Sequence, residues 1–202
     1  MESEKDLTNK SESKKGGMAA SRQGRIILET SRLVLREMTW EDLPDICAIL
    51  QDEETMYAYE HAFSDEEAEN WVRRQLERYE TEGIGLWAVV LKETGAVIGQ
   101  CGLTWQPVPE EYAPSGQAME IGYLFNRNYW HHGYALEAAA GCKMYAFEVL
   151  KEPRICSIIR DNNTASIHVA ERNGLKPAGS FVKHYYGVDM PHIIFSAEND
   201  SL

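Results

Sequence analysis

The alternation of apolar and polar positions predicts a succession of short strands and amphipathic helices. Apolar residues at every second position, as at Leu33 and Leu35, indicate strands, and apolar residues three or four positions apart indicate helices. By these patterns, strands are expected at residues 32–37, 86–91, 97–105, 119–125, 155–159, 181–186 and 192–196. Capping and glycine signals place the starts of four helices near Thr39, Ser64, Gly133 and Asn163.

The order of these elements predicts the fold class and the domain organisation. Strands come first and then alternate with helices, which is typical of an α/β (α+β) protein with a sheet of mixed direction. Residues 1–24 are polar and without periodicity, so we expect them to form a flexible N-terminal extension. Residues 25–202 are then long enough for a single well-cored domain.

Composition places the chain among globular proteins without membrane spans. Hydrophobic residues make up 44% and charged residues 26% of the 202 positions, which is ordinary for a soluble domain. No apolar run approaches the roughly 18 residues that a spanning helix needs, and the first residues lack a secretory signal. We therefore expect a cytoplasmic protein with no membrane partner. Four scattered cysteines, without metal or redox spacing, are expected to be reduced thiols: Cys47, Cys101, Cys142 and Cys156.

The formal charge of −12 is distributed unevenly. Residues 1–25 contain six basic and four acidic side chains, which leaves 14 basic against 28 acidic side chains in the remainder. Such a field repels nucleic acid and favours a cationic substrate such as an amine. The alternative is that the acidic excess only keeps the protein soluble.

The segment from Tyr129 to Ala138 has the features of a phosphate-binding turn. It joins a β-rich stretch to a helical pattern, and Gly133 stands where the chain turns into the helix. The first amides of a helix have no internal partner, and the helix dipole adds partial positive charge there. A pyrophosphate would accept hydrogen bonds from these amides and neutralise the partial positive charge, which points to coenzyme A and acyl transfer. One glycine alone is better explained by an ordinary turn between a strand and a helix, with apolar aromatic residues in the core.

Three separated segments resemble the GNAT superfamily of acyl-CoA N-acetyltransferases, in its Rim-type (ribosomal-protein-alanine N-acetyltransferase) branch. Residues 29–43 resemble the opening strand and first helix, residues 128–138 the pyrophosphate loop, and residues 163–175 the next helix that contacts coenzyme A. The order and spacing agree over about residues 29–197. This resemblance implies a mostly antiparallel central sheet of about seven strands flanked by about four helices.

The resemblance also implies which residues bind acetyl-CoA. Main-chain groups of Leu124 and Phe125 would receive the pantetheine and the thioester oxygen. The remaining candidates for binding acetyl-CoA are Asn128, His131, His132, Gly133, Tyr134, Ala135, Asn163 and Ser166. Asn163 has the alternative role of capping its helix. A metal site is not expected, because His131 and His132 diverge on a turn and no third ligand is suitably spaced.

Three residues are candidates for the acyl-transfer chemistry. Glu120 lies in an apolar stretch where burial would raise its pKa toward that of a useful base. Its alternative is a structural ion pair with Arg32 or Arg36. By the resemblance, Ser166 is expected to donate to the sulfur of coenzyme A, and its alternative is a packing role. The family's tyrosine acid falls at Ala170 here, so Tyr185 or Tyr186, and of these Tyr186, is the candidate replacement.

The leading functional hypothesis is an acetyl-CoA-dependent N-acetyltransferase that acts on a primary amine by direct attack. The acceptor would be either the amino terminus of a protein or a small amine, and a homodimer is an open alternative. A different hypothesis, supported by Ala170 and His131, is a CoA-binding sensor or interaction module without turnover. A P-loop enzyme is disfavoured, since the Gly-Lys-Ser/Thr signature is missing.

Overall fold

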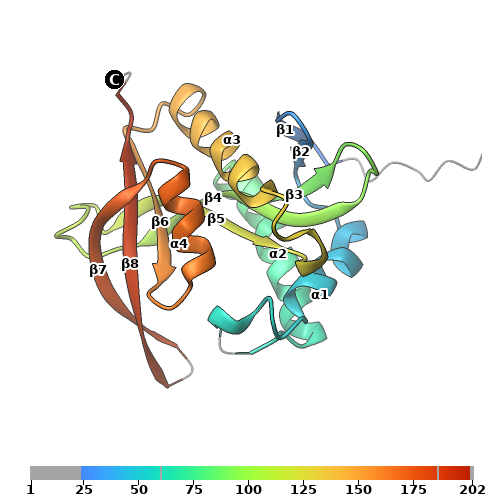
Figure 1. The fold of residues 1–202 in the computed structure, drawn as a ribbon, viewed down its shortest axis with the longest axis horizontal. Coiled ribbons are helices and arrows are strands. Elements are labelled where there is room, and N and C mark those ends of the chain that lie inside the picture. Colours follow the sequence, from blue (N-terminus) through green and yellow to red (C-terminus); the bar gives the residue numbers. More distant parts are fainter. Residues whose placement is uncertain (1–23, 60, 186, 201–202) are drawn as a thin grey trace, which may run out of the picture.

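The described part of the chain forms one sheet of eight strands with four α-helices around it (Figure 1). The computed structural model describes residues 24–59, 61–185 and 187–200. The strands are β1 Ile26–Glu29, β2 Leu33–Arg36, β3 Leu86–Leu91, β4 Val97–Pro107, β5 Gln117–Phe125, β6 Arg154–Arg160, β7 Lys176–Tyr185 and β8 Val188–Glu198. The helices are α1 Leu43–Leu50, α2 Asp65–Thr81, α3 Tyr134–Glu148 and α4 Thr164–Arg172.

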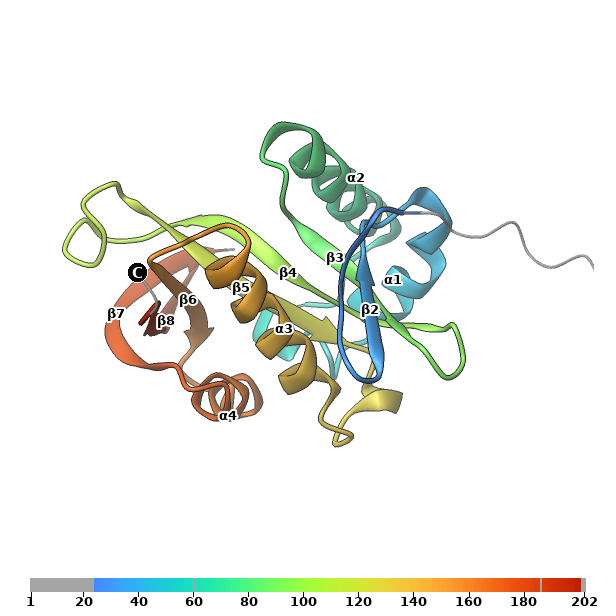
Figure 2. The same ribbon diagram turned by 90° about the horizontal axis from the view of Figure 1, so that it is seen from above.

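The strand order β1-β2-β3-β4-β5-β6-β8-β7 confirms the predicted mixed, mostly antiparallel sheet. All neighbouring pairs are antiparallel except β5 and β6, which run parallel. Figure 2 shows α1 and α2 on one face of the sheet and α3 and α4 on the other. Strands β3 and β4 are thus covered on both faces, which explains why their residues are almost continuously buried rather than alternating.

Two apolar cores hold the layers together. On the side of α3, Trp87, Leu103 and Ile121 are almost completely buried in the larger core. On the side of α1 and α2, Leu50 and Val72 belong to the second core. Burial of each large apolar side chain contributes about 1.5–3 kcal/mol, so the two cores fix how the sheet and its helices lie relative to each other.

The predicted starts of the first two helices are confirmed, with one local difference. The N–H of Ser64 donates to Glu67 (2.8 Å) in a capping box that opens α2. At Thr39 the chain first forms a 3-10 turn, Trp40–Asp42, and α1 begins only at Leu43. The reason is Asp42, which is fully buried and held by the side chain of Arg36.

The strands at the two ends of the sheet differ from the prediction. The four-residue β1 was not predicted, because its two half-buried positions are too few to set an alternating pattern. Strand β7 begins at Lys176 rather than at residue 181, and nearly all of its residues are exposed. Strand β8 begins at Val188 rather than at residue 192. Edge strands are held by backbone pairing, which leaves little hydrophobic signal in their sequence.

Strands β5 and β6 diverge soon after they meet, which opens a fork in the middle of the sheet (Figure 1). They pair at a single position, Glu120 opposite Cys156, whereas β4 and β5 pair over nine positions. Helix α3 follows β5 and α4 follows β6, so both helices begin near the open end of the fork. Among the described residues, no helix has the length and apolarity to cross a membrane.

Candidate active site

Beyond the one position where β5 and β6 pair, side chains join the two strands at the start of the fork. The Ser157 hydroxyl donates to the carbonyl oxygen of Ile121 at 3.1 Å. The N–H of Ile158 donates to Oε1 of Glu120 at 3.0 Å. Each bond satisfies a backbone group that a continuous ladder would have paired, and buried backbone groups of this kind are rarely left without a partner. The side chains of Ser157 and Glu120 therefore stabilise the separation of the two strands.

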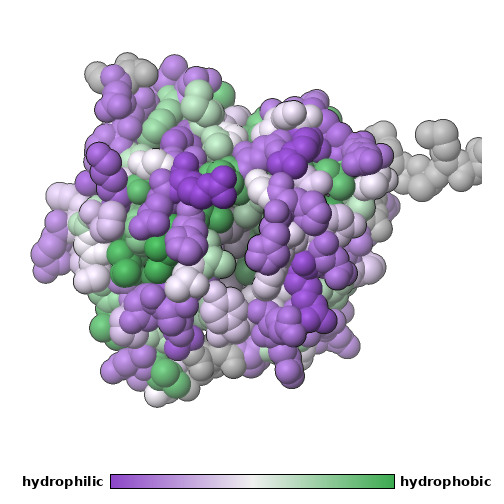
Figure 3. Space-filling model, viewed as in Figure 1, coloured by the Kyte–Doolittle hydropathy of each residue, from purple (hydrophilic) through white to green (hydrophobic). Residues whose placement is uncertain are grey.

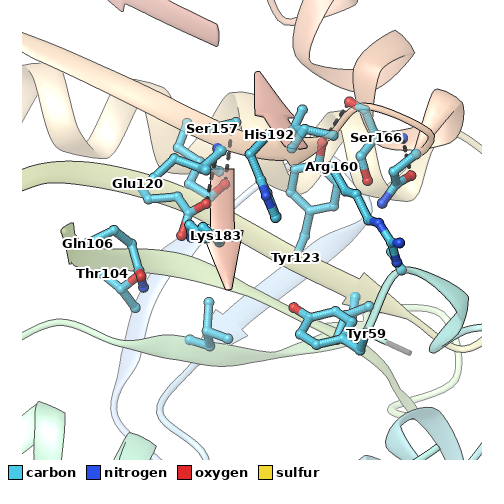
Figure 4. Close-up of a pocket in the computed structure, with 18 of the residues that line it drawn as sticks. Tyr59, Thr104, Gln106, Glu120, Tyr123, Ser157, Arg160, Ser166, Lys183 and His192 are labelled. Carbon is cyan, nitrogen blue, oxygen red and sulfur yellow. Dashed lines mark hydrogen bonds between the residues drawn. The ribbon is translucent and has the colours of Figure 1, made fainter. Parts of the chain in front are cut away.

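A pocket of about 410 Å³ occupies the fork and reaches from α2 to the start of α4. Its walls come from the diverging ends of β5 and β6, from β4, α2, the start of α4 and the β7–β8 hairpin, and from the segment before α2 that holds Thr55, Ala58, Tyr59 and Phe63. Figure 3 shows the surface hollowed between the two halves of the sheet, and Figure 4 shows the polar side chains that face this space. Glu120, Ser166 and His192 are among them.

The register of β5 determines which amides face the fork. The Asn126 N–H donates back to β4, and successive residues of a strand direct their main-chain groups to opposite sides. Leu124 therefore turns its amide to β4, whereas Tyr123 and Phe125 turn theirs to the fork, as Ile121 does with its carbonyl. This corrects the expectation for Leu124: its side chain lines the pocket, but its N–H is committed to the sheet.

The Glu120 carboxylate lies between the fork and the pocket. Burial raises the pKa of this carboxyl, against the charges of Lys183 and Arg78 and the hydrogen bond from Ile158, which lower it. The ion pair considered from sequence does not form, because Arg32 pairs with Glu137 and Arg36 with Asp42. With Oε1 held by Ile158, Oε2 is the carboxylate oxygen left to meet a ligand.

His192 on β8 presents a second polar group to the same pocket (Figure 4). Its Nδ1 lies 2.7 Å from the carbonyl oxygen of Met190, and a carbonyl can only accept, so Nδ1 carries the proton. Burial lowers the pKa of the imidazole, and the charges of Lys183 and Arg160 lower it further, whereas the bond to Met190 raises it. In the resulting neutral ring Nε2 is an acceptor.

Helix α3 begins directly behind the predicted glycine. Gly133 has φ +80°, a left-handed conformation, and the helix starts at Tyr134 and Ala135. His131, also left-handed at φ +63°, and His132 are exposed beside it. The free amides of this helix end form the kind of anion site that a pyrophosphate needs.

Helix α4 is capped by Asn163, as the alternative reading of this residue predicted. Its Oδ1 accepts from the N–H of Ser166 (3.0 Å) and from the Tyr57 hydroxyl (2.7 Å). The Tyr123 hydroxyl donates to the carbonyl oxygen of Ser166 at 3.1 Å, which ties β5 to α4 across the fork. Ser166 lines the pocket, and its hydroxyl takes part in none of these hydrogen bonds.

Comparison with known proteins identifies the family. Residues 32–176 match the acetyltransferase (GNAT) domain. The chain belongs to the GNAT acetyltransferase family. It is 34% identical over 152 residues to the uncharacterized protein YkkB of Bacillus subtilis, which covers 73% of this chain and 84% of YkkB. It is also 34% identical over 142 residues to an uncharacterized N-acetyltransferase, p20, of Bacillus licheniformis (69% and 76% covered).

The fold of this GNAT acetyltransferase is shared with solved Rim-type enzymes, which confirms that part of the resemblance. One is RimL, a ribosomal L7/L12 alpha-N-protein acetyltransferase in complex with coenzyme A. It aligns with a TM-score of 0.71 at 16% identity, over 88% of this chain and all of RimL. The predicted class of enzyme, an acyltransferase, is confirmed, and the family's donor is acetyl-CoA.

The candidate residues fall into two groups in this GNAT acetyltransferase. Glu120, Leu124, Asn163 and Ser166 line the pocket. The other candidates lie outside it, namely Phe125 at the end of β5 and the residues before and in the first turn of α3: Asn128, His131, His132, Gly133, Tyr134 and Ala135. The predicted Tyr186 lies outside the described residues, whereas its alternative, Tyr185, lines the pocket. The described residues contain no cluster of three His, Cys, Asp or Glu side chains that could hold a metal.

Sequence reasoning missed the pocket residues contributed by distant elements. Arg78 on α2, Lys183 on β7 and His192 on β8 face the fork, yet nothing in their local sequence distinguishes them from ordinary surface or core residues. Tyr123 could have been found from the sequence, because it is a polar aromatic residue in the same central strand as Glu120. Its hydroxyl pKa is raised by burial.

Proposed function

We propose that this enzyme transfers the acetyl group of acetyl-CoA to a primary amine by direct attack. The observation that carries the proposal is the fork, where β5 and β6 pair at one position and then leave main-chain amides unpaired beside a pocket. Pantetheine would enter between the strands, with its pyrophosphate on the amides at the start of α3. The N–H groups of Tyr123 and Phe125, rather than Leu124, would face the thioester.

The transfer forms one bond and breaks one. The amine nitrogen attacks the thioester carbonyl, the C–S bond breaks, and coenzyme A leaves as a thiolate. A fork amide would stabilise the negative charge that develops on the carbonyl oxygen. The proton of the amine would pass to Oε2 of Glu120, directly or through water, and the Ser166 hydroxyl would donate to the sulfur.

Several residues have assigned parts in this proposal beyond Glu120 and Ser166. Asn163 holds the first turn of α4 and so positions the Ser166 hydroxyl. Tyr185 takes the place of Tyr186 as the candidate acid for the thiolate, because Tyr185 lines the pocket and Ala170 is buried without a titratable group. The acceptor is either a protein amino terminus or a small amine. A cytoplasmic location and a single domain over residues 25–202 complete the proposal.

The alternative is a protein that binds coenzyme A without turnover, for which the buried Ala170 is the supporting feature. Two measurements separate the possibilities. Calorimetric titration with acetyl-CoA tests binding at the fork, and release of free thiol with a panel of amines tests transfer. Saturable binding with amine-dependent thiol release supports the enzyme, whereas binding without release supports the sensor. No saturable binding would refute both.

A further inference from the structure

The charge of the pocket is opposite to the charge of the protein. The chain has 20 basic and 32 acidic residues, yet four basic side chains and a single acidic one line the pocket. The basic residues are Arg74 and Arg78 on α2, Arg160 on β6 and Lys183 on β7, and the acidic one is Glu120. A positive pocket in an acidic protein indicates that its ligand carries negative charge.

Three of these cations form no ion pair with the described residues, although Glu120 interacts with Arg78 and Lys183 at longer range. No carboxylate of the described residues lies within ion-pair distance of Arg74, Arg78 or Lys183, and Arg78 is half-buried. Elsewhere, six other cations each have a carboxylate within 4.0 Å: Arg25, Arg32, Arg36, Lys92, Arg127 and Arg154. Arg78 and Lys183 are partly removed from water, and a cation in such a place without an ion-pair partner costs free energy unless a ligand supplies the counter-charge.

The phosphates of coenzyme A do not account for this charge. The residues that line the pocket include none between positions 125 and 156, so the pocket is separate from the loop that leads into α3. Arg74 and Arg78 lie one turn apart on α2, which covers the opposite face of the sheet from α3. The cations therefore surround the side of the fork from which the acceptor would approach.

We propose that the acceptor is a primary amine that also carries a carboxylate, held by Arg74, Arg78 and Lys183 while its amine meets Glu120. This inference rests on the proposed acetyl transfer. It reverses the expectation from net charge, since a polyamine would meet these three cations and be repelled. The carboxylate would belong either to a free amino acid or to an acidic residue near a peptide amino terminus.

Matched acceptors test the proposal with the full-length enzyme and acetyl-CoA. Free L-amino acids are compared with their α-carboxamides, the peptide amide Ala-Asp-Glu with Ala-Asn-Gln, and spermidine serves as a cationic acceptor. We expect kcat/KM to be about tenfold or more higher for the acidic member of one pair, and that pair identifies the source of the carboxylate. Because a carboxamide lowers the basicity of the neighbouring amine and leaves more free base, the comparison is biased against the proposal. Equal rates, or a preference for spermidine, would overturn it.

Variants of the pocket cations test which residues cause the preference for an acidic acceptor. Arg74→Gln, Arg78→Gln and Lys183→Gln should each lower the ratio of kcat/KM for the acid over the neutral acceptor about tenfold. The ratio is the proper readout, because an indirect effect through Glu120 falls on both acceptors equally. Arg73→Gln is the control: Arg73 is exposed on the same helix and bonded to Asn70, outside the pocket. An unchanged ratio in all three pocket variants would contradict the assignment.

A binding measurement keeps this test independent of turnover. Calorimetry compares the N-acetylated acid with its N-acetylated carboxamide, the two products of the amino-acid pair, and the same comparison is made for the peptides. Tighter binding of one acid, lost in Arg78→Gln and retained in Arg73→Gln, supports the anion site even if no thiol is released and the proposed transfer fails. Binding without preference for either acid, or no binding of either, overturns it.

Discussion

At the scale of single residues, Glu120 combines two roles that are normally separate. One carboxylate oxygen replaces a missing backbone acceptor for Ile158, and the other faces the pocket. The first role is structural and needs only an oxygen. The second role needs a negative charge. A substitution that removes the charge but keeps the oxygen therefore distinguishes the two roles.

Glu120→Gln is expected to lower the rate of acetyl transfer at least about hundredfold with little change in acetyl-CoA affinity. Glutamine keeps an oxygen for Ile158 but cannot accept the proton of the amine. Thiol release measured beside calorimetric binding checks this expectation. An unchanged rate would remove Glu120 as the base and leave neutral His192 as the next group to replace.

The same substitution has an expected effect on stability. The pKa of Glu120 is higher in the folded protein than in the unfolded chain, so the folded state loses stability as pH rises from the usual range of a glutamate through that raised pKa. Glutamine avoids this cost. The melting temperature of Glu120→Gln at pH 7.5 should equal or exceed that of the wild type, and a large decrease would indicate that the charge itself holds the fork.

At the scale of elements, the start of α3 depends on a backbone conformation that only glycine adopts without strain. Gly133 (φ +80°) and Gly95 (φ +73°) share this conformation, but Gly95 lies in the β3–β4 hairpin turn. Alanine at either position should lower the free energy of unfolding by about 1–2 kcal/mol. We expect only Gly133→Ala to weaken acetyl-CoA binding as well, measured by calorimetry. Equal affinities in the two variants would place the pyrophosphate elsewhere.

Helix α3 is also fastened to the first strands through Glu137. Its carboxylate accepts from the Thr30 hydroxyl at 2.6 Å and from the backbone and side chain of Arg32 at 2.8 and 2.7 Å. Burial alone would raise the pKa of Glu137, but these bonds outweigh burial and lower it. The stability that they contribute is therefore present at neutral pH and lost as pH falls below the usual range of a glutamate.

Glu137→Gln should lower the free energy of unfolding at pH 7 by about 1–3 kcal/mol, because glutamine loses the charge-assisted bonds. The difference from the wild type should shrink in acid, where the glutamate itself becomes neutral. Denaturant unfolding at pH 7 and pH 3.5 measures both values. A difference that does not depend on pH would assign the effect to packing rather than to charge.

At the scale of the whole molecule, the fork, the pocket and the start of α3 all lie within residues 24–200. A protein that begins at Gly24 is therefore expected to keep the wild-type kcat/KM within about twofold and the same stabilisation by acetyl-CoA, about 2.7 kcal/mol at a hundredfold excess over Kd. Steady-state thiol release and thermal unfolding with acetyl-CoA check this. A loss of transfer would assign the first 23 residues a part in the site.

The sequence by itself determined most of the elements and, through the resemblance, the family. Hydrophobic period, capping residues and glycines act over a few neighbouring positions, which is why α2, the β3–β4 hairpin and the turn at Gly133 were predicted closely. The placement of Glu120 in the central strand and the cap at Asn163 followed from the same local signals.

Only the tertiary structure decided what surrounds those residues. The register of β5 assigned the fork amides to Tyr123 and Phe125 instead of Leu124, because pairing with β4 is a property of two strands. Net charge predicted a cationic substrate, whereas folding gathers Arg74, Arg78 and Lys183 at one acidic residue. Electrostatic interactions depend on distance in space, and residues from α2, β5 and β7 become neighbours only when the sheet has formed.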